Sequence, residues 1–226
     1  MEQNLPYSSN YNNLIIRNIS EKDIPHVVNL QKASFADMAA YGMIWPKSFL
    51  KSHIHIFPEG QFCAEIDERI VGSASSLMVS IEPKYMDHTW YDITGNGLFI
   101  NHNYNADSLY CADISAHPEF QRKGIGTALY NARKNLAMKL NLRRIIAGGR
   151  LYDYCKYSHI MSAQEYVEKV VKKKIVDPVL TFQLKNGFRF IKLLDEYLYD
   201  ERSLNYATFI EWLNPKYIHH YSSDIY

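Results

Sequence analysis

The 226-residue sequence contains no long hydrophobic run, and this absence excludes several classes of protein. No apolar stretch approaches the roughly 20 residues that a membrane-spanning helix needs. The first residues also lack the basic and then apolar leader of a secreted protein. We therefore expect a soluble, cytoplasmic protein with no membrane partner.

An excess of charge of one sign is also absent. The 25 lysines and arginines nearly balance the 24 aspartates and glutamates, which leaves a formal net charge of +1. A chain without a basic excess has no long-range field that draws it to nucleic acid or anionic lipid. We therefore expect no nucleic-acid partner, and basic residues can matter only locally.

Cysteine is scarce, with Cys63, Cys111 and Cys155 as its three occurrences. Their odd number and their spacing predict a reducing compartment and no metal site. Apolar residues, in contrast, make up 47% of the chain, enough to fill one sizeable core. We predict one domain over 1–226 with a core at about 14–213, insertions at 81–107 and 150–176, and a tail at 214–226.

The most informative stretch runs from residue 109 to residue 140. Residues 108–116 are small and apolar, as in a strand, and Pro118 ends that strand because proline cannot donate to a sheet ladder. From Ile125 onward, apolar residues recur at the spacing of one helix face. The polar loop 121–126 joins the two elements.

A glycine loop between a strand and a helix start predicts an anion site. The first helical turn leaves backbone N–H groups unpaired and carries partial positive charge. Gly124 and Gly126 would let a phosphate approach the backbone, while Arg122 and Lys123 add charge and Thr127 adds a hydroxyl. The loop lacks the Gly-Lys-Ser/Thr of a P-loop and the three spaced glycines of the dinucleotide fingerprint.

The pattern Q-x-x-G-x-G at 121–126 resembles the pyrophosphate-binding motif of the GNAT superfamily of N-acetyltransferases. The predicted order of strands and helices along residues 14–213 is similar to that fold as well. The resemblance implies an α/β (α+β) fold with a mixed, mostly antiparallel central sheet flanked by helices. It also implies that acetyl-CoA, or coenzyme A, is the cosubstrate and that the acetyl group passes directly to an amine.

The same resemblance implies the cofactor contacts. The pantetheine arm would pair with the strand backbone as an added strand does, and the pyrophosphate would lie on the loop and the helix start. The residues so implied are Ile114, Ser115 and Ala116 for the arm, and Gln121, Arg122, Lys123, Gly124, Ile125, Gly126 and Thr127 for the pyrophosphate.

The sequence departs from the family pattern where the leaving thiolate is usually protonated. Phe182 and Gly187 are similar to the family's late F-Y-x-x-x-G-F signature, but Gln183 stands in the place of its tyrosine. The tracts 90–97, 147–150 and 177–184 look more specifically like an acetyltransferase-type domain that some bacterial proteins fuse to a carbon-nitrogen hydrolase. In that case Gln183 is a subfamily feature. Tyr152, Tyr154 or Tyr157 of the second insertion could supply the acid, and Tyr154 is our candidate; the alternative is that each is a buried or wall-forming aromatic.

The base is also displaced from its usual position, because the family's glutamate would fall near Tyr110. Asp113 is the nearest acid and is our candidate base. If the strand alternates regularly, Asp113 shares a face with Leu109 and Cys111, and burial should raise its pKa. A structural role, with the carboxylate held by backbone N–H groups or by Arg150, is the alternative.

Both insertions are rich in aromatic residues and are expected to line the acceptor side of the site. Asp87, Asp92 and Asp153 would then favour a cationic acceptor, whereas the alternative is that the insertions only cover sheet edges. The acceptor itself, a small-molecule or peptide amine, stays open, and a homodimer is compatible with the sequence. The alternative function is a non-catalytic coenzyme A sensor or docking module, which would keep the loop without the acid and base.

Overall fold

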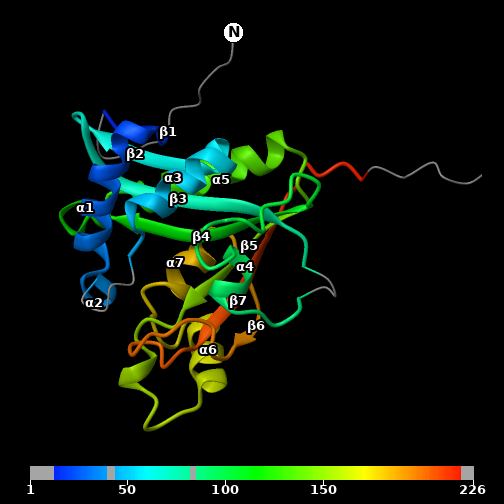
Figure 1. Ribbon diagram of the computed structural model, residues 1–226. Coiled ribbons are helices and arrows are strands. Elements are labelled where there is room, and N and C mark those ends of the chain that lie inside the picture. The colour runs from blue at the N-terminus through cyan, green and yellow to red at the C-terminus, as the bar shows by residue number, and fades with distance from the viewer. Residues whose placement is uncertain (1–12, 40–43, 82–84, 220–226) are drawn as a thin grey trace, which may run out of the picture.

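A computed structural model describes residues 13–39, 44–81 and 85–219. Its seven strands form one sheet in the order β1-β2-β3-β4-β5-β7-β6, which runs from β1 near the top of Figure 1 down to β7 and β6. The β4–β5 pairing is parallel and the other five pairings are antiparallel, so the predicted mixed, mostly antiparallel sheet is confirmed. The strands are β1 (Ile15–Asn18), β2 (Gln61–Ile66), β3 (Arg69–Val79), β4 (Ser108–Ala116), β5 (Arg144–Arg150), β6 (Arg189–Leu194) and β7 (Ala207–Leu213).

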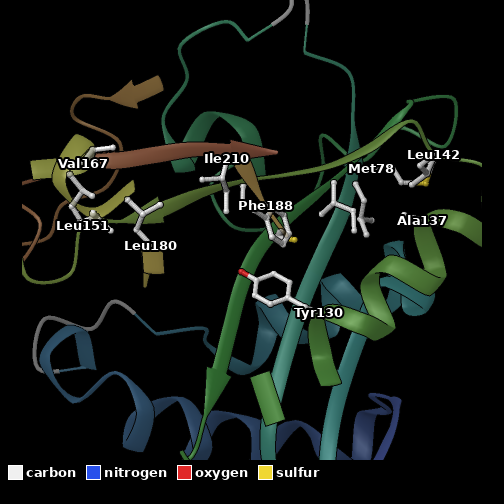
Figure 2. Packing of buried hydrophobic residues seen from close by; sticks show 14 of the residues in the cluster. Met78, Tyr130, Ala137, Leu142, Leu151, Val167, Leu180, Phe188 and Ile210 are labelled. Atoms are coloured by element: carbon white, nitrogen blue, oxygen red, sulfur yellow. The ribbon is translucent and has the colours of Figure 1, made fainter. Parts of the chain in front are cut away.

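Helices cover both faces of this sheet because successive strand residues point to opposite sides. Leu109 of β4 packs with the helices of one face, whereas the next residue, Tyr110, packs with those of the other. The first face carries α5 (Ile125–Lys139), α6 (Ala163–Val171) and α7 (Leu180–Lys185), whose contacts Figure 2 shows. The second carries α1 (Ile24–Ser34), α3 (Lys47–Ile56) and α4 (Trp90–Thr94), while the short α2 (Ala36–Ala39) follows α1.

Capping side chains set several helix starts. Ser20 and Asp23 form the predicted capping box before α1, and Ser162 and Glu165 form one before α6. Asp177 and Pro178 form a local pattern typical of a helix start, but α7 begins only at Leu180. Asp177 still caps it, because its Oδ1 accepts hydrogen bonds from the backbone N–H groups of Val179 and Leu180.

The structure also defines two segments that the sequence left open. The first insertion contains α4, which begins with a capping box between Thr89 and Asp92. The described part of the tail packs back on the domain, where the Asn141 side chain accepts from the Ile218 N–H and donates to its carbonyl, both at 2.9 Å. The tail beyond residue 219 lies outside the described residues.

A bulge interrupts β4 at Ala112. The register between β3 and β4 shifts so that Asp113 and Cys111 lie opposite consecutive residues of β3, which leaves Ala112 as an extra residue. Cys111 points toward α5, while Asp113 accepts a hydrogen bond from Gln31 of α1 on the other face. The predicted regular alternation is therefore wrong: Asp113 does not share a face with Leu109 and Cys111.

Beyond the bulge, β4 and β5 part. They pair only from Ser108 to Cys111 on β4 and from Arg144 to Ala147 on β5. The last residues of β5 continue to pair with β7, and the last residues of β4 continue to pair with β3. The sheet thus contains a wedge-shaped gap between two strand ends.

Candidate active site

A cavity of about 830 Å³ lies where β4 and β5 part. The cavity reaches both faces of the sheet. On the face covered by α5 and α7 it is lined by Cys111, Tyr130 and Gln183, and on the face covered by α1, α3 and α4 it is lined by Trp45 and Trp90. We call these parts the α5 half and the α1 half. Two molecules that enter from opposite faces could therefore meet in the gap.

Gly148 and Gly149, two consecutive glycines on β5, allow side chains to pack directly against the strand backbone on both faces of the sheet. A Cβ at Gly148 would lie 2.2 Å from Cζ of Tyr197, and a Cβ at Gly149 would lie 2.3 Å from Oε1 of Gln183. Tyr197 belongs to the cluster on the α1 face, and Gln183 lies on α7. Both glycines lie inside β5 and line the cavity.

Asp113 lies in the cavity wall within a hydrogen-bonded network. The Gln31 amide donates to its Oδ2 at 3.3 Å and accepts from the backbone N–H of Trp45 at 3.0 Å. The side chain of Trp45 also hydrogen-bonds the carboxylate. Burial raises the pKa of Asp113 to about 6, although the positive charge of Arg133 and these hydrogen bonds oppose the shift. A carboxylate of this kind can accept a proton at neutral pH.

The predicted anion loop lies at the N-terminus of α5. Gly124 adopts φ +85°, and a Cβ there would meet nothing within 4 Å, so the helix end is open to a ligand. Gly126 differs, because its Cβ would lie 2.7 Å from Cζ of Phe182 on α7. This glycine therefore permits α5 and α7 to approach each other, and its predicted contact with the pyrophosphate stays a prediction. Of the loop residues, Gln121 lines the cavity.

The free edge of β4 leads from that loop toward the gap. Ile114, Ser115 and Ala116 pair with β3 along one edge, while β5 has already turned away from the other. The Oγ atoms of Ser115 and Ser73 lie 2.8 Å apart, which ties β4 to β3. An open strand edge of this kind can bind an extended ligand arm as an added strand.

Tyr154, the predicted acid, does not line the cavity among the described residues. Its hydroxyl donates to the carbonyl of Met161 at 3.3 Å, and its ring packs against Tyr166 and Tyr206. The structure thus gives Tyr154 a packing role, which was the alternative. Tyr152, from the same insertion, does line the cavity.

Sequence reasoning missed Tyr130, which fills the α5 half. The residue is 1% exposed and lies on α5, and Figure 2 shows its ring extending away from the helix with the hydroxyl at the far end. Burial raises the pKa of this hydroxyl well above its ordinary value, and a hydrogen bond with Gln183 opposes the shift. Oε1 of Gln183 is buried and has no hydrogen-bond partner among the described residues. A prediction that counted as buried the positions next to the apolar face of this helix would have included Tyr130.

Both insertions contribute to the cavity, but not through the expected carboxylates. Trp90, Tyr91 and Asn96 line it from the first insertion, and Arg150 and Tyr152 from the second. The three aspartates, in contrast, make contacts outside the cavity lining. Asp87 pairs with Lys192 at 2.6 Å, Asp92 accepts from the Thr89 hydroxyl at 2.7 Å and Asp153 pairs with Arg202 at 2.9 Å.

Two features are absent from the described part of the chain. Within residues 13–39, 44–81 and 85–219, no group of three or more histidine, cysteine or acidic side chains could hold a metal ion. In the same ranges, no helix combines the length and the apolar character needed to cross a membrane.

Comparison with known sequences identifies relatives of the whole domain. The chain is 46% identical over 206 residues to "Probable hydrolase YhcX" of Bacillus subtilis (strain 168), covering 91% of this chain but 39% of that protein. It therefore corresponds to less than half of that longer protein. It is 42% identical over 204 residues to "Uncharacterized N-acetyltransferase YkwB" of the same organism, covering 90% of each chain.

Solved structures confirm the fold. The loading GNATL domain of CurA from Lyngbya majuscula matches with a TM-score of 0.77 at 20% identity, over 89% of this chain and 98% of that one. The GphF GNAT-like decarboxylase in complex with isobutyryl-CoA matches with a TM-score of 0.73 at 15% identity, over 88% and 98%. The family described as "Acetyltransferase (GNAT) family" matches residues 27–153. With this match and the relative that is similar over 90% of its length, the chain belongs to the GNAT acetyltransferase family.

Proposed function

We propose that this chain is an N-acyltransferase that moves an acetyl group from acetyl-CoA directly to an amine. The observation that carries the proposal is the cavity through the sheet, which has a carboxylate suited to proton removal in one half and an open strand edge and helix N-terminus beside the other. Acetyl-CoA would enter from the α5 face and the amine from the α1 face. The family and the N-acetyltransferase relative support this reading.

Asp113 would prepare the amine for attack. With a pKa of about 6, its carboxylate is ionised at neutral pH and can take one proton from an ammonium group. The nitrogen lone pair then forms a bond to the thioester carbon across the gap. Gln31 and Trp45 fix the carboxylate in the wall, so this proton transfer needs no rearrangement.

Tyr130 would stabilise the departing sulfur. When the tetrahedral intermediate collapses, the C–S bond breaks and its electron pair passes to sulfur, while the second proton of the nitrogen neutralises that sulfur. The Tyr130 hydroxyl, with its raised pKa, stays protonated and so can donate a hydrogen bond to the sulfur. Gln183, whose amide contacts this hydroxyl, would orient it.

A second candidate, acyl-CoA decarboxylation, is suggested by Arg133. This arginine is fully buried and lines the cavity, and its Nη1 has no hydrogen-bond partner among the described residues. Its other nitrogens bond Ser76 and the carbonyl of Ser75 at 2.9 and 2.7 Å. A carboxylate on the acyl group could take the free N–H, and one structural neighbour carries the name of a GNAT-like decarboxylase.

One experiment separates the candidates. The full chain is incubated with acetyl-CoA and a panel of amines, and free thiol and acetylated product are measured together. We expect thiol release that depends on the amine. Malonyl-CoA in place of acetyl-CoA, with carbon dioxide as the readout, tests decarboxylation. Binding of coenzyme A without either reaction would leave the sensor or docking function instead.

A further inference from the structure

The α1 half of the cavity has aromatic and apolar walls. They come from α1, α3, α4 and the segments that flank them, so the walls are built from separate parts of the chain. The lining side chains include Phe35, Trp45, Phe49, Trp90 and Tyr91, together with Leu198 from the segment between β6 and β7.

Two of these rings are fixed beside Asp113. The rings of Trp45 and Trp90 have centroids 5.0 Å apart. Nε1 of Trp90 donates to the carbonyl of Ala112 at 3.0 Å, while the Trp45 side chain hydrogen-bonds the Asp113 carboxylate itself. Both indoles are thus anchored to the bulge that carries the base. A cation beside aromatic faces and a carboxylate is stabilised by both.

The charges of the α1 half of the cavity match a single positive charge on the acceptor. Asp113 is the one acidic side chain among the described lining residues. Arg150 also lines the cavity, but its guanidinium is paired with Asp200 at 2.7 Å and with Asp37 at 3.1 Å. A second ammonium group on the acceptor would therefore meet no free carboxylate, and a carboxylate on the acceptor would find Arg150 already occupied. Burying either charge without a partner is costly.

We infer that the acceptor is a primary monoamine that carries a flat apolar group, such as an arylalkylamine, with its ammonium at Asp113 and its ring among the walls of the α1 half. This inference rests on the proposed function and narrows it. Polyamines and aminoglycosides carry too many positive charges for these walls. Free amino acids carry a carboxylate that meets no unpaired cation in the α1 half, because Arg133, whose Nη1 has no partner among the described residues, projects from α5 on the opposite face.

The test compares acceptors that differ in one property. With acetyl-CoA fixed, kcat/KM is measured for tryptamine, for tryptophan, which adds a carboxylate, for spermidine and for an alanine-initiated hexapeptide. Tryptamine should exceed each of the others by about 10²-fold, since each of them brings an unpaired charge or a polar chain into the walls. A preference for spermidine, tryptophan or the peptide overturns the inference but keeps N-acetylation. Inactivity with all four overturns it too, and the proposed function fails only if the wider amine panel is also inert.

A pair of exposed tyrosines in the first insertion provides matched variants. Tyr91 lines the cavity, whereas Tyr104 is outside its lining. Tyr91→Ala should raise KM for tryptamine about tenfold, as expected for loss of an aromatic wall, and should leave coenzyme A binding unchanged. Tyr91→Phe keeps the ring and should have the KM of the wild type for tryptamine. Tyr104→Ala should change neither this KM nor the binding of coenzyme A. Equal KM values for Tyr91→Ala and Tyr104→Ala would contradict the placement of the acceptor ring.

Discussion

Asp113 and Tyr130 reach the same cavity from opposite faces of the sheet. The carboxylate is held by α1, and the hydroxyl projects from α5, with the gap between β4 and β5 separating them. This relationship depends on the bulge at Ala112, which turns Asp113 away from the face of Cys111. The proposed mechanism therefore has proton removal on one face of the sheet and sulfur release on the other.

The base is tested by Asp113→Asn, which keeps the size of the side chain and removes its basicity. We expect kcat to fall about 10²-fold or more, with the affinity for coenzyme A unchanged. In the wild type, the rate should fall as pH drops through about 6, because the carboxylate becomes protonated there. A normal rate of acetylation by the variant at every pH would show that Asp113 is not the base.

The same variant has an effect on stability, whose sign follows from the raised pKa. A carboxyl group whose pKa is about 6 in the folded chain and 3.8 in the unfolded chain stabilises the fold below 3.8 and loses that contribution as pH rises through 6. Asp113→Asn should therefore raise Tm at pH values above 6. Below 3.8 the two proteins should differ less. A Tm difference of equal size at both pH values would assign the change to packing instead.

The role of Tyr130 is tested by removing its hydroxyl. Tyr130→Phe should lower kcat about tenfold or more, as for loss of one donor to a developing charge, while KM for acetyl-CoA stays unchanged. Tyr154→Phe is the matched control and should keep wild-type kcat, because that hydroxyl bonds the carbonyl of Met161. If the control loses as much activity as Tyr130→Phe, the sequence-based choice of Tyr154 regains support.

The cofactor loop is tested by thermal shift. Excess coenzyme A should raise Tm of the wild type by mass action. Gly126→Arg should abolish this rise, because its side chain would displace Phe182 and separate α7 from the helix start. Arg122→Ala should only reduce the rise, since it removes one charge and leaves the backbone N–H groups. An unchanged melting curve of the wild type in excess coenzyme A would contradict the cofactor assignment.

The packing of β5 against α7 also makes a prediction about the stability of the fold. Gly149→Ala should lower Tm, because its Cβ would lie 2.3 Å from Oε1 of Gln183, and overpacking of this kind costs about 1–3 kcal/mol. Gln183→Ala removes the obstructing amide, so the double variant should recover part of the loss. Additive losses in the double variant would show that the two residues do not compete for the same space.

The sequence predictions that the structure confirms concern elements formed by contiguous residues. A strand stopped by proline, a glycine loop and an amphipathic helix are contiguous in 108–140, so the local elements and their order could be read directly. The capping boxes at Ser20 and Ser162 are also local. The box at Ser162 directly precedes α6, whereas the box at Ser20 precedes the 3-10 turn Glu21–Asp23 that leads into α1.

The residues that escaped prediction depend on contacts between distant segments. No pattern within β4 marks Ala112 as a bulge, because the shift is defined by its register with β3. The hydrogen bond between Tyr130 and Gln183 of α7 joins residues 53 positions apart by subtraction of their numbers, so no local pattern reveals it. Tyr154 was chosen from its place in an aromatic insertion, and its partners in the fold, Tyr166 and Tyr206, could not be read from that tract.

The most direct test of the proposed mechanism follows one reaction with two readouts. Wild-type protein and Asp113→Asn are incubated with acetyl-CoA and tryptamine, and mass spectrometry measures acetylated tryptamine while a thiol reagent measures coenzyme A. We predict that the wild type forms both products in equal amounts and that the variant, with unchanged coenzyme A binding, forms both much more slowly. Release of coenzyme A without acetylated amine, or equal product from both proteins, would contradict direct transfer with Asp113 as the base.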